Sequence, residues 1–267
     1  MTLQKWIKDR AIHGYPTFSI EDVRATGMYS SEQILQNELS RLCANKTITN
    51  VYRGFYVIIP IHYVLRGSVP ATYYIDQLMA YLDKPYYVSM LSAAELLGSA
   101  HQRPQKFSIM TVLPKRRTVS NRNVTIDWFY REQLPKESLI TRNTETGTIY
   151  ISNPLLTAAD LVQYQQHVGG LSRVATILEE LCEQIDIQSQ FVPLVPFVKK
   201  VVWQRLGYIL EHIIEEQSLA DELYEQLHSK YSFPKYLPLS TSVDDNLSLR
   251  DSRWKININV QIETDDI

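Results

Sequence analysis

The order of local structure in the first sixty residues constrains the fold of this chain most strongly. Residues 30–57 read SSEQILQNELSRLCANKTITNVYRGFYV. The apolar residues of the first half repeat at helical spacing: Leu35, Leu39, Leu42 and Cys43. The β-branched and aromatic runs ITNVY and FYVII then flank Arg53 and Gly54, as in a tight hairpin. The sequence therefore predicts a helix that is followed at once by a two-stranded ribbon.

Two short helices are expected before this one. Leu3, Trp6, Ile7 and Ile12 share one helical face, and we expect that helix to end near Gly14. A second helix is indicated by Ser19 with Asp22 three residues on, which is the spacing of a capping box, and it should stop by Gly27.

The ends of the third helix carry signals of their own. We expect it to begin at Ser30 or Ser31, with Gln33 in the reciprocal capping position for Ser30. We expect it to end at Asn45, a residue type that tolerates the left-handed conformation.

Three short helices followed by a ribbon are the order of a winged helix-turn-helix, whose third helix enters the major groove of DNA while the ribbon lies along the backbone. Glutamine and asparagine can pair with adenine edges and arginine with guanine or phosphate, and the polar face of the third helix is Gln33, Gln36, Asn37, Ser40 and Arg41. Glu32 and Glu38 lie on or near that helix and would repel phosphate. The alternative is a protein-interaction module with the same fold, in which this helix merely has a solvated side.

Charge is distributed unevenly, although the whole chain sums to only -2. Residues 1–66 sum to +3 and residues 101–142 to +6, whereas residues 67–100 sum to -2 and residues 143–267 to -9. A basic front half fits polyanion binding better than a uniformly neutral enzyme does. Two ordinary solvated faces are the alternative.

The chain changes character at RGSVPATYY, residues 66–74, where glycine, serine and proline indicate a linker. We therefore predict two domains, residues 1–66 and residues 67–267. In the second domain we expect helices at 75–82 and 86–97, then strands in KFSIMTVL, NVTIDWFY and GTIYISN. Helices should follow from residue 155, with a fresh cap at Ser218 and Asp221, and a last strand in WKININVQIE. The predicted fold class is α+β, a winged helix domain followed by a mixed α/β domain.

Common catalytic and metal-binding signatures are absent from the sequence. It has no CxxC, HExxH, GxSxG, Walker loop or GxGxxG, and its six histidines are widely spaced. A metal-dependent nuclease would need carboxylate partners for Asp127 from distant segments, because GTIYISN offers no acid-x-lysine pair. We therefore expect no catalysis, no cofactor and no metal. Cys43 and Cys182 are expected to be buried hydrophobes and not a disulfide.

Two charged stretches have open interpretations. Residues 103–122 hold six basic side chains and no acid: Arg103, Lys106, Lys115, Arg116, Arg117 and Arg122. They could neutralise phosphates beyond the first domain, or they could be a solvated strand edge that discourages aggregation. The acidic helices of residues 179–225 are either plain surface or a site for a basic partner. No apolar run approaches the roughly 20 residues of a membrane span, and the N-terminus lacks the apolar core of a signal peptide, so we expect a cytoplasmic protein.

Three longer segments bear a family resemblance. YYVSMLSAAELLGSAHQRPQKFSIMT, ISNPLLTAADLVQYQQHVGGLSRVATILEELCEQID and RWKININVQIE together resemble the AbiEi family, the antitoxins of abortive-infection type IV toxin-antitoxin systems. The resemblance implies a winged helix domain that represses its own operon by binding promoter inverted repeats, and a C-terminal domain needed for antitoxicity. It also implies a nucleotidyltransferase toxin as functional partner, without a stable complex.

In this family DNA contact falls on the third helix, the wing and basic residues elsewhere. Carried onto this sequence, that implies contacts with double-stranded DNA by Gln33, Gln36, Asn37, Ser40, Arg41, Lys46 and Arg53, with Lys115, Arg116 and Arg117 as further candidates.

Overall fold

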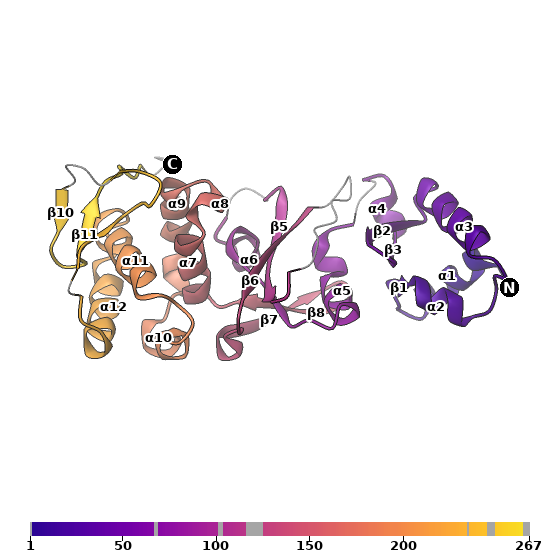
Figure 1. Ribbon diagram of the computed structural model, residues 1–267, viewed down its shortest axis with the longest axis horizontal. Coiled ribbons are helices and arrows are strands. Elements are labelled where there is room, and N and C mark those ends of the chain that lie inside the picture. The colour runs from indigo at the N-terminus through magenta and orange to yellow at the C-terminus, as the bar shows by residue number, and fades with distance from the viewer. Residues whose placement is uncertain are drawn as a thin grey trace. The chain divides into compact units, whose positions relative to one another are not determined.

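The computed structural model describes residues 2–66, 69–100, 104–115, 125–233, 235–244 and 249–263. These residues form a mixture of helices and three β-sheets (Figure 1). Contacts divide the chain into two compact units. The first comprises Met1–Tyr87, Gln105–Glu132 and Thr141–Tyr150, and the second Val88–Pro104, Gln133–Ile140 and Ile151–Ile267. The expected domain division after residue 66 stays a prediction.

The first unit begins with a helix, a strand, two helices and a hairpin. Their bounds are α1 (Leu3–Ile12), β1 (Thr17–Ser19), α2 (Ile20–Ala25), α3 (Glu32–Ala44), β2 (Ile48–Tyr52) and β3 (Phe55–Ile58). The predicted three helices and hairpin are confirmed. β1 was not predicted, and it pairs antiparallel with β3 to give a sheet of order β1-β3-β2.

A capping box marks the start of α2, whereas the ends of α3 differ from those expected. Ser19 and Asp22 form the expected capping box, with bonds of 2.7 and 3.1 Å between each side chain and the other residue's backbone N–H. The N-cap of α3 is Ser31, which makes no side-chain cap bond, so the expected role of Gln33 was wrong. Lys46, with φ 55°, is the left-handed residue after α3, whereas the expected Asn45 has φ -80°.

One hydrophobic core holds these elements together. The predicted α3 stripe of Leu35, Leu39 and Leu42 is buried together with residues of α1, β1 and the hairpin. Phe18 stacks on Tyr56 with ring centroids 5.3 Å apart, which joins β1 to β3. Burial of these side chains leaves the opposite side of α3 in solvent.

The remaining helices and strands before residue 153 include a five-stranded sheet of order β6-β5-β4-β8-β7. Their bounds are α4 (Ile61–Val64), α5 (Ile75–Tyr81), β4 (Tyr86–Val88), α6 (Met90–Leu97), β5 (Lys106–Val112), β6 (Thr125–Arg131), β7 (Leu139–Thr144) and β8 (Gly147–Ser152), with 3₁₀ turns at Ala71–Tyr73 and Lys136–Ser138. β5 and β6 are parallel, as are β4 and β8.

The prediction of one helix over residues 86–97 was wrong in its first part. Tyr86–Val88 is the buried strand β4, and the helix starts only at Met90. A three-residue aromatic and β-branched run that pairs with a distant strand has no local periodicity to distinguish it from helix. The three predicted strands are confirmed, and β7 was missed.

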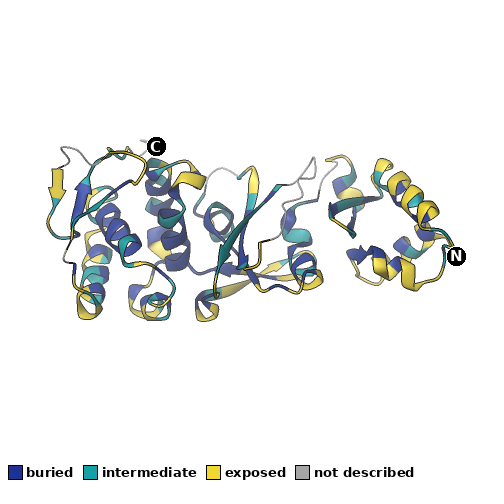
Figure 2. Cartoon of the chain, viewed as in Figure 1, coloured by how far each residue is buried: buried dark blue, intermediate teal, exposed yellow. Residues whose placement is uncertain are grey.

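The second unit is mainly helical after residue 153. It contains α7 (Pro154–Gln163), α8 (Gln165–Val168), α9 (Leu171–Leu181), α10 (Ile187–Leu194), α11 (Lys200–His212) and α12 (Gln217–Lys230), with a 3₁₀ turn at Cys182–Gln184. α7 packs against α6, α9, α10 and α11. Figure 2 shows it dark blue along most of its length, and the nine residues from Pro154 to Val162 are buried. A helix that is apolar on nearly all sides is central to its unit.

The expected cap at Ser218 was wrong, because α12 already begins at Gln217 with Glu216 as N-cap residue. Both cysteines are free thiols, as expected. Burial raises the pKa of Cys43, and it raises that of Cys182 to about 11, so both thiols stay protonated at neutral pH. Among the described residues no helix is both long and apolar enough to cross a membrane.

A small sheet ends the described chain and is anchored to α11. Its strands are β9 (Leu237–Pro238), β10 (Leu249–Asp251) and β11 (Ile256–Ile258), in the order β10-β11-β9. Trp254 is fully buried, and its Nε1–H donates to Glu211 at 2.6 Å. A Cβ on Gly207 would lie 2.1 Å from the Trp254 ring, so α11 needs glycine where the indole packs.

Candidate functional site

The exposed face of α3 is polar but uncharged at its centre. At about 100° per residue, Gln33, Asn37 and Ser40 lie opposite the buried leucine stripe, and all three are exposed. The Gln33 amide donates to Asn37 Oδ1 at 3.1 Å. This face therefore presents amide and hydroxyl groups that can both donate and accept hydrogen bonds.

The two acids on α3 lie at the edges of this face, and each is paired with an arginine. Glu38 accepts from Arg41 Nη2 at 2.6 Å, which raises the pKa of Arg41. Glu32 accepts from Arg24 Nη2 at 2.7 Å, and this bond holds the pKa of Glu32 below its usual value. The repulsion of phosphate expected from these acids is thus partly neutralised within the protein.

The predicted cations beside α3 are exposed. Lys46 follows the C-terminus of the helix, and Arg53 stands in the turn between β2 and β3. Within the described part of the chain neither side chain has an ion pair, so both charges are available to a ligand. Arg41 shares its charge with Glu38.

Asn50 fixes the hairpin that carries Arg53. Its Nδ2 donates to the carbonyl oxygens of Tyr52 at 2.9 Å and Phe55 at 3.2 Å. Gly54 has φ +72°, and a Cβ there would lie 3.2 Å from Ile20 and from the Tyr81 hydroxyl. The turn is therefore held in one conformation against α2, and Arg53 projects from it.

A cleft of about 620 Å³ lies beside α3 and brings predicted and unpredicted residues together. Gln36 and Arg53 line it, together with Arg24, Glu32 and Asn50. Arg24 was missed by sequence reasoning. Its ion pair with Glu32 joins α2 to α3 across eight positions, and no local motif signals such a contact.

The further basic residues predicted to contact DNA, Lys115, Arg116 and Arg117, follow β5 and are not part of α3 or the hairpin. Lys115 is exposed just after β5. Lys84 is buried and donates to the Pro114 carbonyl at 2.7 Å, which fixes the chain immediately before Lys115. Arg116 and Arg117 lie outside the described residues, as do Arg103 and Arg122. Lys106 is paired with Asp127 at 3.4 Å.

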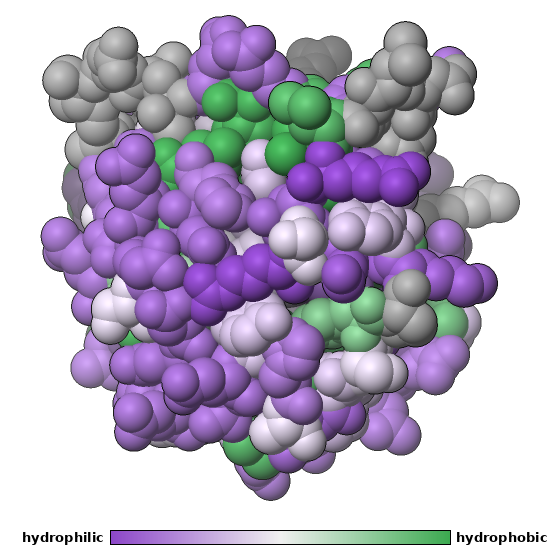
Figure 3. All heavy atoms as spheres, turned by 90° about the vertical axis from the view of Figure 1, so that its left-hand side faces the viewer, coloured by the Kyte–Doolittle hydropathy of each residue, from purple (hydrophilic) through white to green (hydrophobic). Residues whose placement is uncertain are grey.

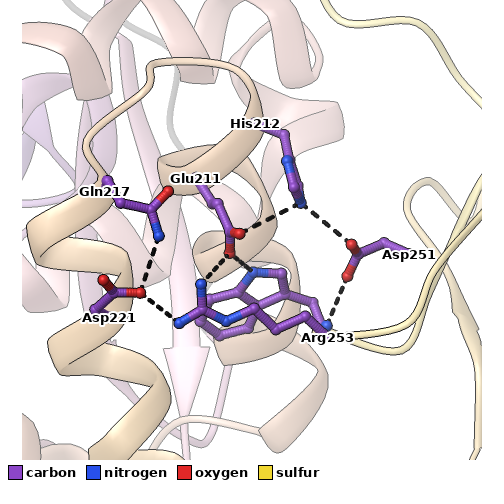
Figure 4. A network of polar contacts seen from close by, with 7 residues as sticks. Glu211, His212, Gln217, Asp221, Asp251 and Arg253 are labelled. Carbon is purple, nitrogen blue, oxygen red and sulfur yellow. Dashed lines mark hydrogen bonds and ion pairs between the residues drawn. The ribbon is translucent and has the colours of Figure 1, made fainter.

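No group of three or more histidine, cysteine and carboxylate residues suited to a metal ion occurs in the described ranges. In the second unit, a network of polar contacts surrounds Arg253 (Figure 4). Its guanidinium contacts Glu211 at 3.0 Å and Asp221 at 2.5 Å, while His212 contacts Asp251 at 3.2 Å. These bonds join α11 and α12 to the last sheet, so the cluster stabilises the packing of that sheet on the two helices.

The end of the second unit that carries this sheet is hydrophilic over most of its visible area, with apolar side chains gathered near one edge (Figure 3). The exposed apolar residues of the second unit include Val243 and Leu249.

Comparison with known proteins identifies the family. Residues 87–212 match the family described as "AbiEi antitoxin C-terminal domain". This segment belongs to the AbiEi antitoxin family. The match supports an antitoxin role in an abortive-infection system, and an antitoxin implies a toxin as partner. No curated protein matches the sequence.

A solved structure titled "Crystal structure of RV2827C protein from Mycobacterium tuberculosis" has a similar fold. Its TM-score is 0.68 at 12% sequence identity, and the alignment covers 94% of the present chain and 88% of the other. At this identity the similarity concerns the fold alone. It agrees with the mixed α and β architecture described above.

Proposed function

We propose that this AbiEi-family protein is a bifunctional antitoxin of a type IV system that represses its own operon. Residues 1–66 are a winged helix domain in this account, in which α3 enters the major groove and the β2–β3 hairpin is the wing. Residues 67–267 are the antitoxin domain. The protein acts in the cytoplasm, without catalysis, cofactor or metal.

One observation carries the proposal for DNA. The centre of the exposed α3 face is uncharged and rich in amides, both acids at its edges are paired with arginines, and Lys46 and Arg53 flank it. Amides that read base edges and cations that contact phosphate are the two classes of contact a specific DNA-binding surface needs. The ligand is double-stranded promoter DNA with inverted repeats. Gln33, Gln36, Asn37, Ser40 and Arg41 are the proposed groove contacts.

The toxin is a nucleotidyltransferase in this proposal, and its effect is countered without a stable complex. Lys115, Arg116 and Arg117 are proposed as further backbone contacts, because a basic segment extends a phosphate footprint.

The second candidate function is a protein-interaction module that does not bind DNA. The observation in its favour is that Arg24 and Arg41 already have carboxylate partners. DNA would have to compete with those partners, and the remaining surplus of positive charge over residues 1–66 is modest.

Repression and antitoxicity, the two activities of the proposed function, are tested together in cells. A reporter fused to the upstream DNA of the gene measures repression, and survival after induction of the neighbouring toxin measures antitoxicity. We expect Gln33→Ala with Asn37→Ala to abolish repression and to leave toxin protection intact. Gln4→Ala, at an exposed glutamine of α1 away from α3, is the matched control. Repression that survives the double substitution would contradict the proposed DNA-reading face.

A further inference from the structure

Arg24 lines the cleft beside α3 and is held there by two carboxylates. Its Nε and Nη2 donate to the two oxygens of Glu32, at 3.1 and 2.7 Å, and its Nη1 donates to Glu21 at 2.6 Å. These three bonds leave further N–H groups of the guanidinium available, because arginine has more donors than they use. The Arg24 side chain is 42% exposed, so an acceptor from solvent can reach it.

Glu32 also fixes the side-chain amide of Gln36. Its Oε1 also accepts from Gln36 Nε2 at 2.9 Å, so one carboxylate fixes both an arginine on α2 and an amide on α3. The hydrogen bond from Arg24 holds the pKa of Glu32 below its usual value, so the pair persists to a lower pH than it would otherwise.

Arg24 and Gln36 line the cleft beside α3. Arg53 and Asn50 of the hairpin line it too. Exposed ion pairs of this kind contribute little to stability. Stability is thus a weak reason for the arrangement, whereas a fixed guanidinium beside a fixed amide suits recognition, since less side-chain freedom is lost when a ligand binds.

We propose that Arg24 is an additional DNA contact and that Glu32 is a positioning residue, which presents Arg24 and Gln36 together to the duplex. This inference rests on the proposed function, and it adds α2 to the recognition surface. The free guanidinium edge contacts guanine or phosphate, and Gln36 reads the adjoining base edge. Glu32 therefore increases sequence discrimination although its charge disfavours DNA as a whole.

The test is fluorescence anisotropy of the full-length chain with two duplexes, its own upstream DNA and a scrambled duplex of equal composition. The variants are Glu32→Gln and Arg24→Gln. Asp9→Asn and Lys5→Gln on α1 reproduce the same charge changes away from the cleft. The readout is the ratio of the two affinities. A smaller folded fraction or a uniform change of charge would alter both affinities alike and leave this ratio unchanged.

We expect Glu32→Gln to lower this ratio about ten-fold while binding to the scrambled duplex becomes tighter, since one good base contact contributes discrimination of that order. Asp9→Asn should tighten both duplexes equally. Arg24→Gln should weaken upstream DNA about ten-fold, and Arg24→Lys should restore charge-driven binding to the scrambled duplex but not the ratio, because lysine lacks the bidentate fork.

Two failures are distinguishable. If Glu32→Gln behaves like Asp9→Asn while the unmodified chain still discriminates, the positioning role is overturned and the proposed function stands. If the unmodified chain does not discriminate between the duplexes, the proposed function itself is overturned, and this inference falls with it.

Discussion

Replacing Gly207 by alanine separates two opposing effects in α11. Helix propensity alone predicts stabilisation, because alanine is better than glycine in a helix interior by about 1 kcal/mol. However, the added Cβ would lie 2.1, 2.2 and 2.5 Å from three atoms of the Trp254 ring. Carbon atoms do not approach so closely, so the ring or the helix must move.

The size of the loss follows from what holds Trp254. Overpacking that is relieved by small shifts costs about 1–3 kcal/mol. Complete expulsion of the indole would forfeit roughly 200 Å² of burial, or about 5 kcal/mol at 25 cal/mol per Å², together with the bond from Nε1 to Glu211. Subtracting about 1 kcal/mol for the gain in helix propensity leaves a loss of at most about 2 kcal/mol for small shifts and about 4 kcal/mol for complete expulsion. Because the contacts are too short for small shifts to relieve, we expect Gly207→Ala to lower the free energy of unfolding by about 2–4 kcal/mol.

Urea unfolding of the full chain, followed by circular dichroism at helical wavelengths, measures this loss. Hydrogen exchange should show reduced protection in residues 249–263 and unchanged protection in α3. The matched control is the cycle with Trp254→Leu, in whose background the new methyl group enters vacated space and should be neutral or stabilising. An equal loss in both backgrounds, or stabilisation of the original chain, would refute the reasoning.

Three other predictions follow from named contacts. Arg53→Ala should weaken binding to upstream and scrambled DNA alike and reduce the magnitude of the salt slope by about 0.9, as measured by anisotropy at several salt concentrations; an unchanged slope would remove Arg53 from the interface. Asn50→Ala should destabilise the hairpin by about 1–2 kcal/mol, because two carbonyl groups lose their donor, and unaltered hydrogen exchange in β2 and β3 would contradict this. Arg253 holds the pKa of Asp221 below its usual value, so the stability that Asp221 contributes is present above its unfolded pKa of about 3.9 and is lost as the pH falls through the folded value. Asp221→Asn should therefore flatten the acid limb of a plot of unfolding free energy against pH, and an unchanged limb would exclude this carboxylate as a source.

Features of the fold that depend on near neighbours in the chain could be predicted. The capping box of Ser19 and Asp22 and the leucine stripe of α3 are determined by residues three or four positions apart, so the sequence displays them directly. The hairpin at Arg53 and Gly54 belongs to the same class, because its turn chemistry is local.

Features that depend on distant partners could not be predicted. β1 exists because Thr17 pairs with Val57, and β4 because Val88 pairs with Ile151. Each has only three residues, which is too short for a period-two pattern. The need for glycine at 207 likewise comes from Trp254, 47 positions later.

The candidate site divides in the same way. The polar α3 residues could be selected from helical spacing alone, since spacing determines which side of the helix is buried. Arg24 could not, because its importance depends on Glu32 and on a cleft that α2, α3 and the hairpin form together. The same pairings changed the interpretation of the α3 acids, which sequence reasoning treated only as repulsive.

The central claim is that this protein binds its own promoter through α3 and the hairpin. The most direct test titrates the full-length protein against its upstream duplex and a scrambled duplex by anisotropy, at salt concentrations from low to moderate. The account predicts tighter binding to upstream DNA at every concentration, with both affinities falling as salt rises. Equal affinity for the two duplexes, or no binding at low salt, would contradict it.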